Sequence, residues 1–178
     1  MSLYEKVTEF VDKSFKGKKP HFERTVFWYE KFSPVFSEAH KIAAYAHDIE
    51  RAFRDDDMSH GDYNGEFYTK YHPEKGAEII GEFLKQNGAD AKTVTKVQYL
   101  VSKHEVGGDA EQDALMDVDS VSFFETNAET FVTKKALVEG LEKIQGKLDW
   151  MFNRIKSGVA REAARPNYEQ WSEELKKL

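Results

Sequence analysis

The sequence predicts an all-α protein on two observations. Apolar residues recur at helical spacing along almost the whole chain. No convincing run of alternating apolar and polar residues, the pattern of a half-buried β-strand, interrupts them. At 178 residues, the chain is expected to form one domain, spanning 1–178, with a sizeable apolar core.

The helices of the first half are bounded by clear signals. Pro20 suits an early helical position, because its fixed φ and missing N–H cost little there. Ser33-Pro34 and Asn87-Gly88 mark breaks. The helix around His47 is apolar nearly all round, and it is therefore expected at the centre of the core. The expected helices run from about Ser2 to Phe15, Pro20 to Phe32, Ser37 to Phe53, Pro73 to Gln86 and Asp90 to His104.

A polar stretch from Arg54 to Tyr71 has no helical periodicity. It contains three consecutive Asp residues, two Gly and several aromatic residues. We expect a loop, and loops of this length in compact domains tend to be functional or disordered.

The C-terminal part is expected to be helical as well. After the break at Gly107-Gly108, a short helix from about Asp113 to Glu125 leads to a long helix from about Ala128 to Lys156. A further helical segment runs from Ala160 to Arg165 and stops at Pro166, before a final short helix. The long helix carries one apolar stripe that we assign to the core: Leu137, Leu141, Ile144, Leu148, Met151 and Ile155.

Composition excludes several classes of protein. Without cysteine, the chain has no disulfides and no thiolate zinc site, so a metal must be held by nitrogen and oxygen. A net charge of -6 opposes binding to a long nucleic acid. The apolar stretches are far shorter than the ~20 residues of a membrane helix, and the segment from Met1 to Phe15 mixes charged residues among its apolar ones. We therefore expect a soluble, unprocessed, cytoplasmic protein without a membrane partner.

Histidine and aspartate side chains are predicted to point into the core. His47 shares a helical face with Ala43 and Ala44 and is followed directly by Asp48, while His104 lies on the face of Val97 and Val101. A single inward histidine is more often a hydrogen-bonded core residue than a ligand. The adjacent His47-Asp48 pair is harder to explain in that way, because it supplies imidazole nitrogen and carboxylate oxygen from one turn, a donor mixture suited to a divalent transition metal.

The order His21, His47-Asp48, Asp119, each on a separate predicted helix, resembles the H…HD…D signature of the HD superfamily of metal-dependent phosphohydrolases. His21-Phe-Glu-Arg24 is similar to the family's His-x-x-Arg opening, and His72-Pro-Glu-Lys-Gly-Ala77 to its His-x-x-x-Gly-Ala helix start. The closing Asp117-Val-Asp119 resembles its Asp-x-Asp. The resemblance spans about residues 20–125 and implies an HD-type helical bundle, whose core the helices in 128–178 would complete.

The resemblance also implies roles for the site residues. His21, His47, Asp48 and Asp119 would ligate one metal, with Asp117 as the alternative to Asp119. His72 and His104 would either bind a second ion, with Asp48 bridging, or face the substrate phosphate. Asp48, His72 and His104 are therefore the expected catalytic residues.

Four cations are candidates for binding the substrate: Arg24, Arg51, Lys75 and Lys103. Arg51 lies one turn beyond His47, where several family members have a lysine that faces phosphate. A surface salt bridge from Arg51 to Glu50, Asp55 or Asp56 is the alternative. Glu50 departs from the nucleotidase-like members, which have an acidic residue three positions after the Asp of the pair instead of two.

Two other histidines are expected outside the site. His40 lies two helical turns before His47, which is too far along the helix axis for the same metal. His60 belongs to the loop, and we favour a solvated side chain there.

The expected function is hydrolysis of a small phosphate ester, a nucleotide or a related phosphorylated metabolite, by water activated at the metal. The donor set favours Mn²⁺, Fe²⁺, Co²⁺ or Ni²⁺ over Mg²⁺, and one ion over two. The loop from Arg54 to Tyr71 would order over the site and set substrate choice. An inactive HD domain that binds a nucleotide or a partner is the alternative, a purely structural bundle is a third hypothesis, and a homodimer is left open.

Overall fold

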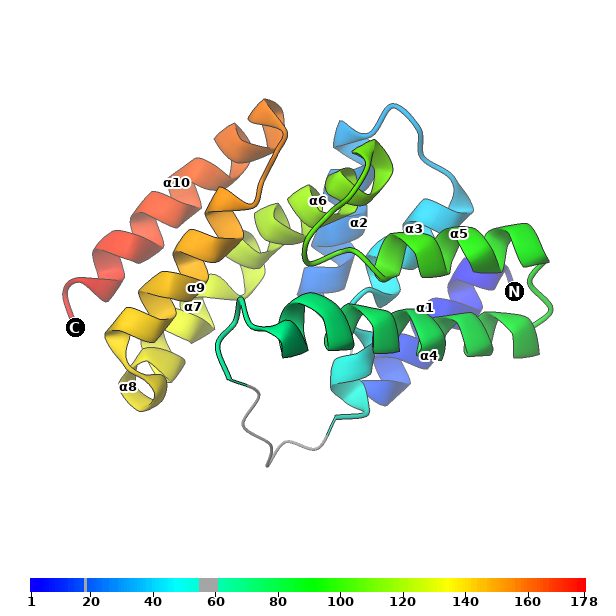
Figure 1. The fold of residues 1–178 in the computed structure, drawn as a ribbon, viewed down its shortest axis with the longest axis horizontal. Helices are drawn as coiled ribbons and strands as arrows, with labels where there is room; N and C mark the ends of the chain where they lie inside the picture. Colours follow the sequence, from blue (N-terminus) through cyan, green and yellow to red (C-terminus); the bar gives the residue numbers. More distant parts are fainter. Residues whose placement is uncertain (18, 55–60) are drawn as a thin grey trace.

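The computed structural model describes residues 1–17, 19–54 and 61–178, and all regular structure within them is helical (Figure 1). The all-α prediction is confirmed. The larger helices are α1 (Leu3–Ser14), α2 (Pro20–Phe32), α3 (Glu38–Ala46), α4 (His72–Gln86), α5 (Ala91–Val101), α6 (Ala110–Thr126), α9 (Leu141–Asn153) and α10 (Gly158–Leu175). Shorter elements are α7 (Ala128–Thr130), α8 (Ala136–Glu139), a 3₁₀ turn (Ile49–Ala52) and two π-helical turns (Phe67–Tyr71 and Phe131–Lys135).

Capping residues explain where α1 and α6 begin. Ser2 accepts a hydrogen bond from the Glu5 amide while the Glu5 carboxylate accepts from the Ser2 amide, which forms a capping box. Asp109 and Gln112 form a second box, so α6 starts at Ala110, a few residues before the expected start at Asp113.

The helices enclose two apolar clusters that α6 connects. The first lies among α1 to α5, and the second lies among the C-terminal half of α6 and the helices that follow. Leu115 and Val118 of α6 belong to the first cluster, while Val121 and Phe124 belong to the second. In Figure 1, α6 runs through the middle of the molecule between these two groups of helices. Asp119 is therefore placed where the two clusters meet.

The helix that precedes the His47-Asp48 pair is shorter than expected. It ends at Ala46 instead of continuing to Phe53, and the chain continues as a 3₁₀ turn from Ile49. Asp48 has φ −91° and ψ 8°, outside the α-helical conformation. This tighter backbone lets the neighbouring side chains of His47 and Asp48 face the same buried space, which consecutive residues of a regular α-helix do not do.

The predicted loop is only partly a loop. Phe67–Tyr71 form a π-helical turn that leads directly into α4, so the helical segment begins before Pro73. The middle of the predicted loop, residues 55–60, which includes Asp55, Asp56 and His60, lies outside the described residues.

The prediction of a single long helix from Ala128 to Lys156 was wrong. A π-helical turn and then Gly140 interrupt it, and Gly140 has φ +96°, a conformation that side chains with a Cβ rarely adopt. Leu137 lies in α8, before the break, and is 73% exposed, while Leu141, the first residue of α9, is 42% exposed. The other predicted stripe residues are buried: Ile144, Leu148, Met151 and Ile155.

Pro166 does not end a helix, which corrects a second expectation. It lies inside α10, on the exposed side. Proline removes a hydrogen bond and crowds the carbonyl four residues earlier. Here that carbonyl belongs to exposed Glu162, while Ala160 and Ala164 keep the opposite side of α10 packed on the core.

Among the described residues, no helix combines the length and the apolar character needed to cross a membrane.

Candidate metal centre

Histidine and aspartate side chains from five parts of the chain converge in the interior. His21 lies in the first turn of α2, His47 and Asp48 follow α3, and Asp119 lies in the middle of α6. His72 opens α4, and His104 follows the end of α5. All six are buried, with at most 7% of any residue exposed. The predicted ligands and the two further histidines therefore share one site.

The first group is built around His21 and His47. Their Nε2 atoms lie 3.2 Å apart, and Asp119 Oδ1 lies 3.0 Å from His21 Nε2 and 3.2 Å from His47 Nε2. Asp48 Oδ2 is 4.0 Å from His47 Nε2. One ligand atom from each of His21, His47 and Asp48 lies within 4.8 Å of the others, which is close enough to hold an ion.

The second group uses the other oxygen of Asp48. Asp48 Oδ1 lies 3.1 Å from His72 Nε2 and 3.9 Å from His104 Nε2, and these three residues form a second cluster that can hold a metal. Asp48 thus lies between two sets of imidazoles.

The ring orientation of three histidines is set from behind the site. His47 Nδ1 donates to the Ala44 carbonyl at 2.9 Å, and His104 Nδ1 donates to the Val101 carbonyl at 2.8 Å. His72 Nδ1 lies 2.7 Å from Glu50 Oε2. With a proton on Nδ1, each ring presents the lone pair of Nε2 to the site, as metal-binding histidines do.

His104 contributes a buried nitrogen that remains unsatisfied in this arrangement. His104 Nε2 is buried and has no hydrogen-bond partner among the described residues. A buried polar atom without a partner costs free energy. A cation at the second group would satisfy it, so the residues present fit a metal on chemical grounds.

The electrostatics also favour a cation. Burial opposes the charged form of His47, but Asp119 and Asp48 outweigh it and raise the pKa of His47 to about 9. Burial alone would raise the pKa of Asp48, yet Arg51, His47 and His72 hold it well below its usual range. The Asp119 pKa is lowered in the same way, against burial, by Arg154, His47 and His21. Both aspartates are therefore ionised at neutral pH, and they favour positive charge at the Nε2 atoms.

Gly76 explains why α4 can approach this centre so closely. A Cβ at this position would lie 3.3 Å from the His47 carbonyl oxygen and 3.8 Å from Glu50 Cβ. Glycine therefore lets α4 pack against the turn that carries the His-Asp pair, and this gives the glycine of the His72-Pro-Glu-Lys-Gly-Ala77 motif a structural reason.

Residues 7–178 match the model of one protein family, described as a domain of unknown function (DUF4202). The chain belongs to the DUF4202 family. No curated protein and no solved structure matches it. The family description names no activity, so the resemblance to HD phosphohydrolases rests on the residues of this chain.

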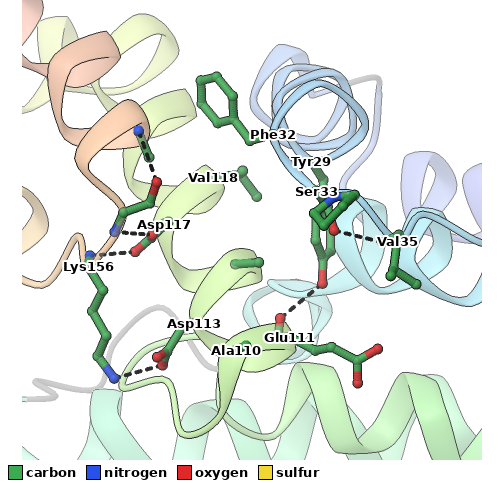
Figure 2. A pocket seen from close by; sticks show the side chains of 14 residues that line it. Tyr29, Phe32, Ser33, Val35, Ala110, Glu111, Asp113, Asp117, Val118 and Lys156 are labelled. Carbon is green, nitrogen blue, oxygen red and sulfur yellow. Dashed lines mark hydrogen bonds and ion pairs between the residues drawn. The ribbon is translucent and has the colours of Figure 1, made fainter.

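In this DUF4202 chain, Asp119 and Asp117 have different surroundings. Positions two apart on an α-helix point about 200° from each other. Asp117 accepts hydrogen bonds from the Lys156 and Ser157 amides, both 2.8 Å, at the start of α10. Figure 2 shows it among the residues that line a cavity of about 460 Å³ between α2, α6 and α10. Asp119, not Asp117, belongs to the centre.

Sequence reasoning missed two residues that surround the centre. Glu105 is buried, with Oε1 4.0 Å from His72 Nε2 and 3.9 Å from His104 Nε2. Arg154 pairs with both Glu105 and Asp119 and donates to Ser120 Oγ at 2.8 Å. Arg154 lies three positions after Met151, a position of the predicted apolar stripe, which was the one available signal for it, whereas the position of Glu105 directly after His104 gives no such signal.

Glu50, noted in the sequence as a departure from the nucleotidase-like pattern, has a structural role. It is buried, and its carboxylate contacts His72 Nδ1 and pairs with Arg54. Burial raises its pKa, but His72 and Arg54 lower it to about 2. Glu50 thereby orients His72.

The four predicted substrate cations have different environments. Arg51 lies at the centre, with Nε 2.8 Å from Asp48 Oδ1 and Nη2 3.7 Å from Glu105 Oε1. Arg24 forms a two-point ion pair with Glu125, at 2.6 and 3.0 Å. Lys75 is exposed and pairs with Glu78 at 2.8 Å, and Lys103 is exposed. Of these four, Arg51 alone has a contact with a predicted ligand in the described part of the chain.

His40 lies apart from the centre, as the helix geometry predicts. It is buried, its Nε2 lies 3.2 Å from Glu111 Oε1, and its Nδ1 contacts Ser37.

Proposed function

We propose that the protein is a metal-dependent phosphohydrolase of the HD type, which hydrolyses a small phosphate ester such as a nucleotide. The observation that carries this proposal is the arrangement of two pairs of histidines around one carboxylate, that of Asp48. One pair is His21 and His47, and the other is His72 and His104. Divalent transition metals prefer imidazole and carboxylate ligands, and several of both are buried together here. An ordered H…HD…D set on separate helices supports the HD type.

The ligands of the first position are His21, His47, Asp48 and Asp119. When bound, a metal there supplies a Lewis acid for phosphate oxygen and lowers the pKa of a coordinated water. The all-nitrogen-and-oxygen donor set with several imidazoles favours Mn²⁺, Fe²⁺, Co²⁺ or Ni²⁺ over Mg²⁺.

The second group has two uses, and the number of bound ions separates them. With one ion, Nε2 of His72 faces the substrate phosphate, because the contact of Nδ1 with Glu50 fixes the orientation of the ring. With two ions, His72 and His104 are ligands, and Glu105 supplies the additional carboxylate that the sequence argument did not find. We keep one ion as the working expectation.

Asp48 is a poor general base in this arrangement. Its pKa is held well below the usual range, chiefly by Arg51. Its role is therefore to bind a cation next to the two pairs of histidines. Arg51 stabilises negative charge on the phosphoryl oxygens.

Two aspartates on one helix provide a matched test. Asp119→Asn should remove bound metal and turnover together, whereas Asp117→Asn should keep both, because Asp117 contacts the start of α10 instead of the centre. Metal content is measured on protein purified without a His tag. Turnover is measured against nucleoside mono-, di- and triphosphates and generic diesters, with each candidate metal added. Equal metal content in the two variants would exclude the assigned centre, and a metal-loaded protein inactive on the whole panel would favour the binding-module alternative.

A further inference from the structure

Lys147 is a buried cation without a carboxylate partner. It lies in α9 between core residues Ile144 and Leu148, and only 5% of the residue is exposed. Other cations near the centre are paired: Arg51 with Asp48, and Arg154 with Glu105 and Asp119. Among the described residues, the Lys147 ammonium has no ion pair and no hydrogen bond.

The aromatic residues around Lys147 compensate its charge only in part. Its Nζ lies 5.1 Å from the centre of the Tyr63 ring and 5.5 Å from that of the Phe123 ring. Cation–π contacts are weaker than a buried ion pair, and a buried charge without an anion is costly. The site is therefore suited to an additional anion.

The charges of the candidate metal centre act directly on Lys147. Burial lowers the pKa of Lys147 to about 8, Glu105 and Asp119 oppose this change, and Arg154 and Arg51 add to it. Lys147 also lies two helical turns before Arg154, on the same side of α9, and Arg154 pairs with Glu105 and Asp119 of the centre. An anion bound by Lys147 would lie beside the metal.

We propose that Lys147 binds an anionic oxygen of the substrate's phosphoryl group, and so acts together with Arg51 as a phosphate-binding cation of this site. This inference rests on the proposed function. Asp48, Asp119 and Glu105 repel a phosphate, and Arg51 and Arg154 are already paired with them. Lys147 has no carboxylate partner, so its positive charge is available to the phosphate. Its burial among apolar residues strengthens this attraction.

Lys143 provides the matched control. It lies one turn earlier in α9, and its Nζ is 5.4 Å from the centre of the same Tyr63 ring. Unlike Lys147, Lys143 is partly exposed and pairs with Glu139 at 3.0 Å. Substitution by Met removes the charge from either residue and keeps most of the aliphatic chain.

Binding of inorganic phosphate, measured by calorimetry on the purified protein with its metal, tests the inference. Lys147→Met should weaken phosphate binding by about ten- to a hundredfold, the usual range for one charge-assisted contact. Lys143→Met should change it by less than about twofold. Metal content should be unchanged in both variants. If Lys147→Met does not fold, Lys147→Gln, which stays polar, is judged in the same way.

The outcomes separate this inference from the proposed function. Unchanged phosphate affinity in the folded neutral variants at position 147 overturns the role of Lys147, even if the enzyme hydrolyses phosphate esters. Loss of phosphate binding in a protein that hydrolyses no ester supports the anion site and counts against the proposed function. An equal loss in Lys143→Met overturns the inference, because it shows a general charge effect. A crystal of the wild-type protein soaked in tungstate should place an oxygen within hydrogen-bond distance of Lys147 Nζ, and tungstate found elsewhere or not at all contradicts the assignment.

Discussion

Replacing Arg154 with Met removes the buried cation that connects Glu105 and Asp119. The guanidinium side chain is 4% exposed, and its two carboxylate partners are 3% and 7% exposed. Breaking a buried ion pair from one side costs about 3–5 kcal/mol, because the remaining charge stays buried without compensation. For a chain of this length, each kcal/mol lowers the Tm by roughly 2–4 °C, so the expected loss is about 6–20 °C.

The metal should offset part of that loss. A divalent cation beside Asp119 neutralises a carboxylate that Arg154→Met leaves unpaired, so added metal should raise the Tm of the variant more than that of the wild type. Calorimetric scans with chelator and with added metal measure both effects. Arg165→Met is the control, since Arg165 pairs with Glu162 at the surface and its loss should leave the Tm unchanged. If Arg154→Met lowered the free energy of unfolding by less than about 1 kcal/mol, Glu105 and Asp119 would not depend on the arginine to compensate their buried charges, and the reasoning would be refuted.

Three further predictions follow from particular residues. Gly140→Ala should destabilise the protein by about 1–3 kcal/mol because of the positive φ, whereas Gly146→Ala, inside α9, should be neutral or stabilising by up to ~1 kcal/mol; urea unfolding of both variants checks this. His72→Ala should leave the metal content near one ion per chain if the centre holds one ion, and metal analysis showing a fall from two ions to one would overturn that expectation. Folded Lys147 releases its proton at about pH 8 and an ordinary lysine at 10.5, so stability should rise with pH between these values by about 1.4 kcal/mol per pH unit. Unfolding measured across this range should show no such rise in Lys147→Met, and an identical rise would contradict the assignment.

The candidate ligands could be predicted because their positions follow from helical periodicity and order. His47 shares a helical face with Ala43 and Ala44, and His104 shares one with Val97 and Val101, so the periodic pattern directs both inward. The prediction did not depend on the exact end of α3. The turn at Asp48 nevertheless decides how both members of the His-Asp pair face the site.

The charged residues around the ligands could not be found in the same way. Arg154 and Glu105 are of types that are almost never fully buried unless paired, so a single sequence favours exposed positions for them. Their burial depends on partners far away in the chain. Arg24 shows the converse, because a long side chain near a predicted ligand pairs instead with Glu125.

The breaks in the C-terminal helices had different causes. A glycine is tolerated inside a helix at a modest cost, so the presence of Gly140 in a helical pattern does not show that this residue adopts a positive φ. Pro166 is normally a stop signal, but an exposed position inside α10 lets the packed face of the helix continue past it.

The proposed metal centre is tested most directly by the transition-metal content of the untagged protein compared with that of Asp48→Asn. Asp48 contacts both imidazole groups and is the residue that they share. Asn keeps the shape of the side chain and removes its charge, so the helical content measured by circular dichroism should be retained. We expect at least one Mn, Fe, Co or Ni ion per wild-type chain, and loss of both the metal and phosphate-ester hydrolysis in Asp48→Asn. A metal-free wild type, or an Asp48→Asn protein with full metal content and turnover, would contradict it.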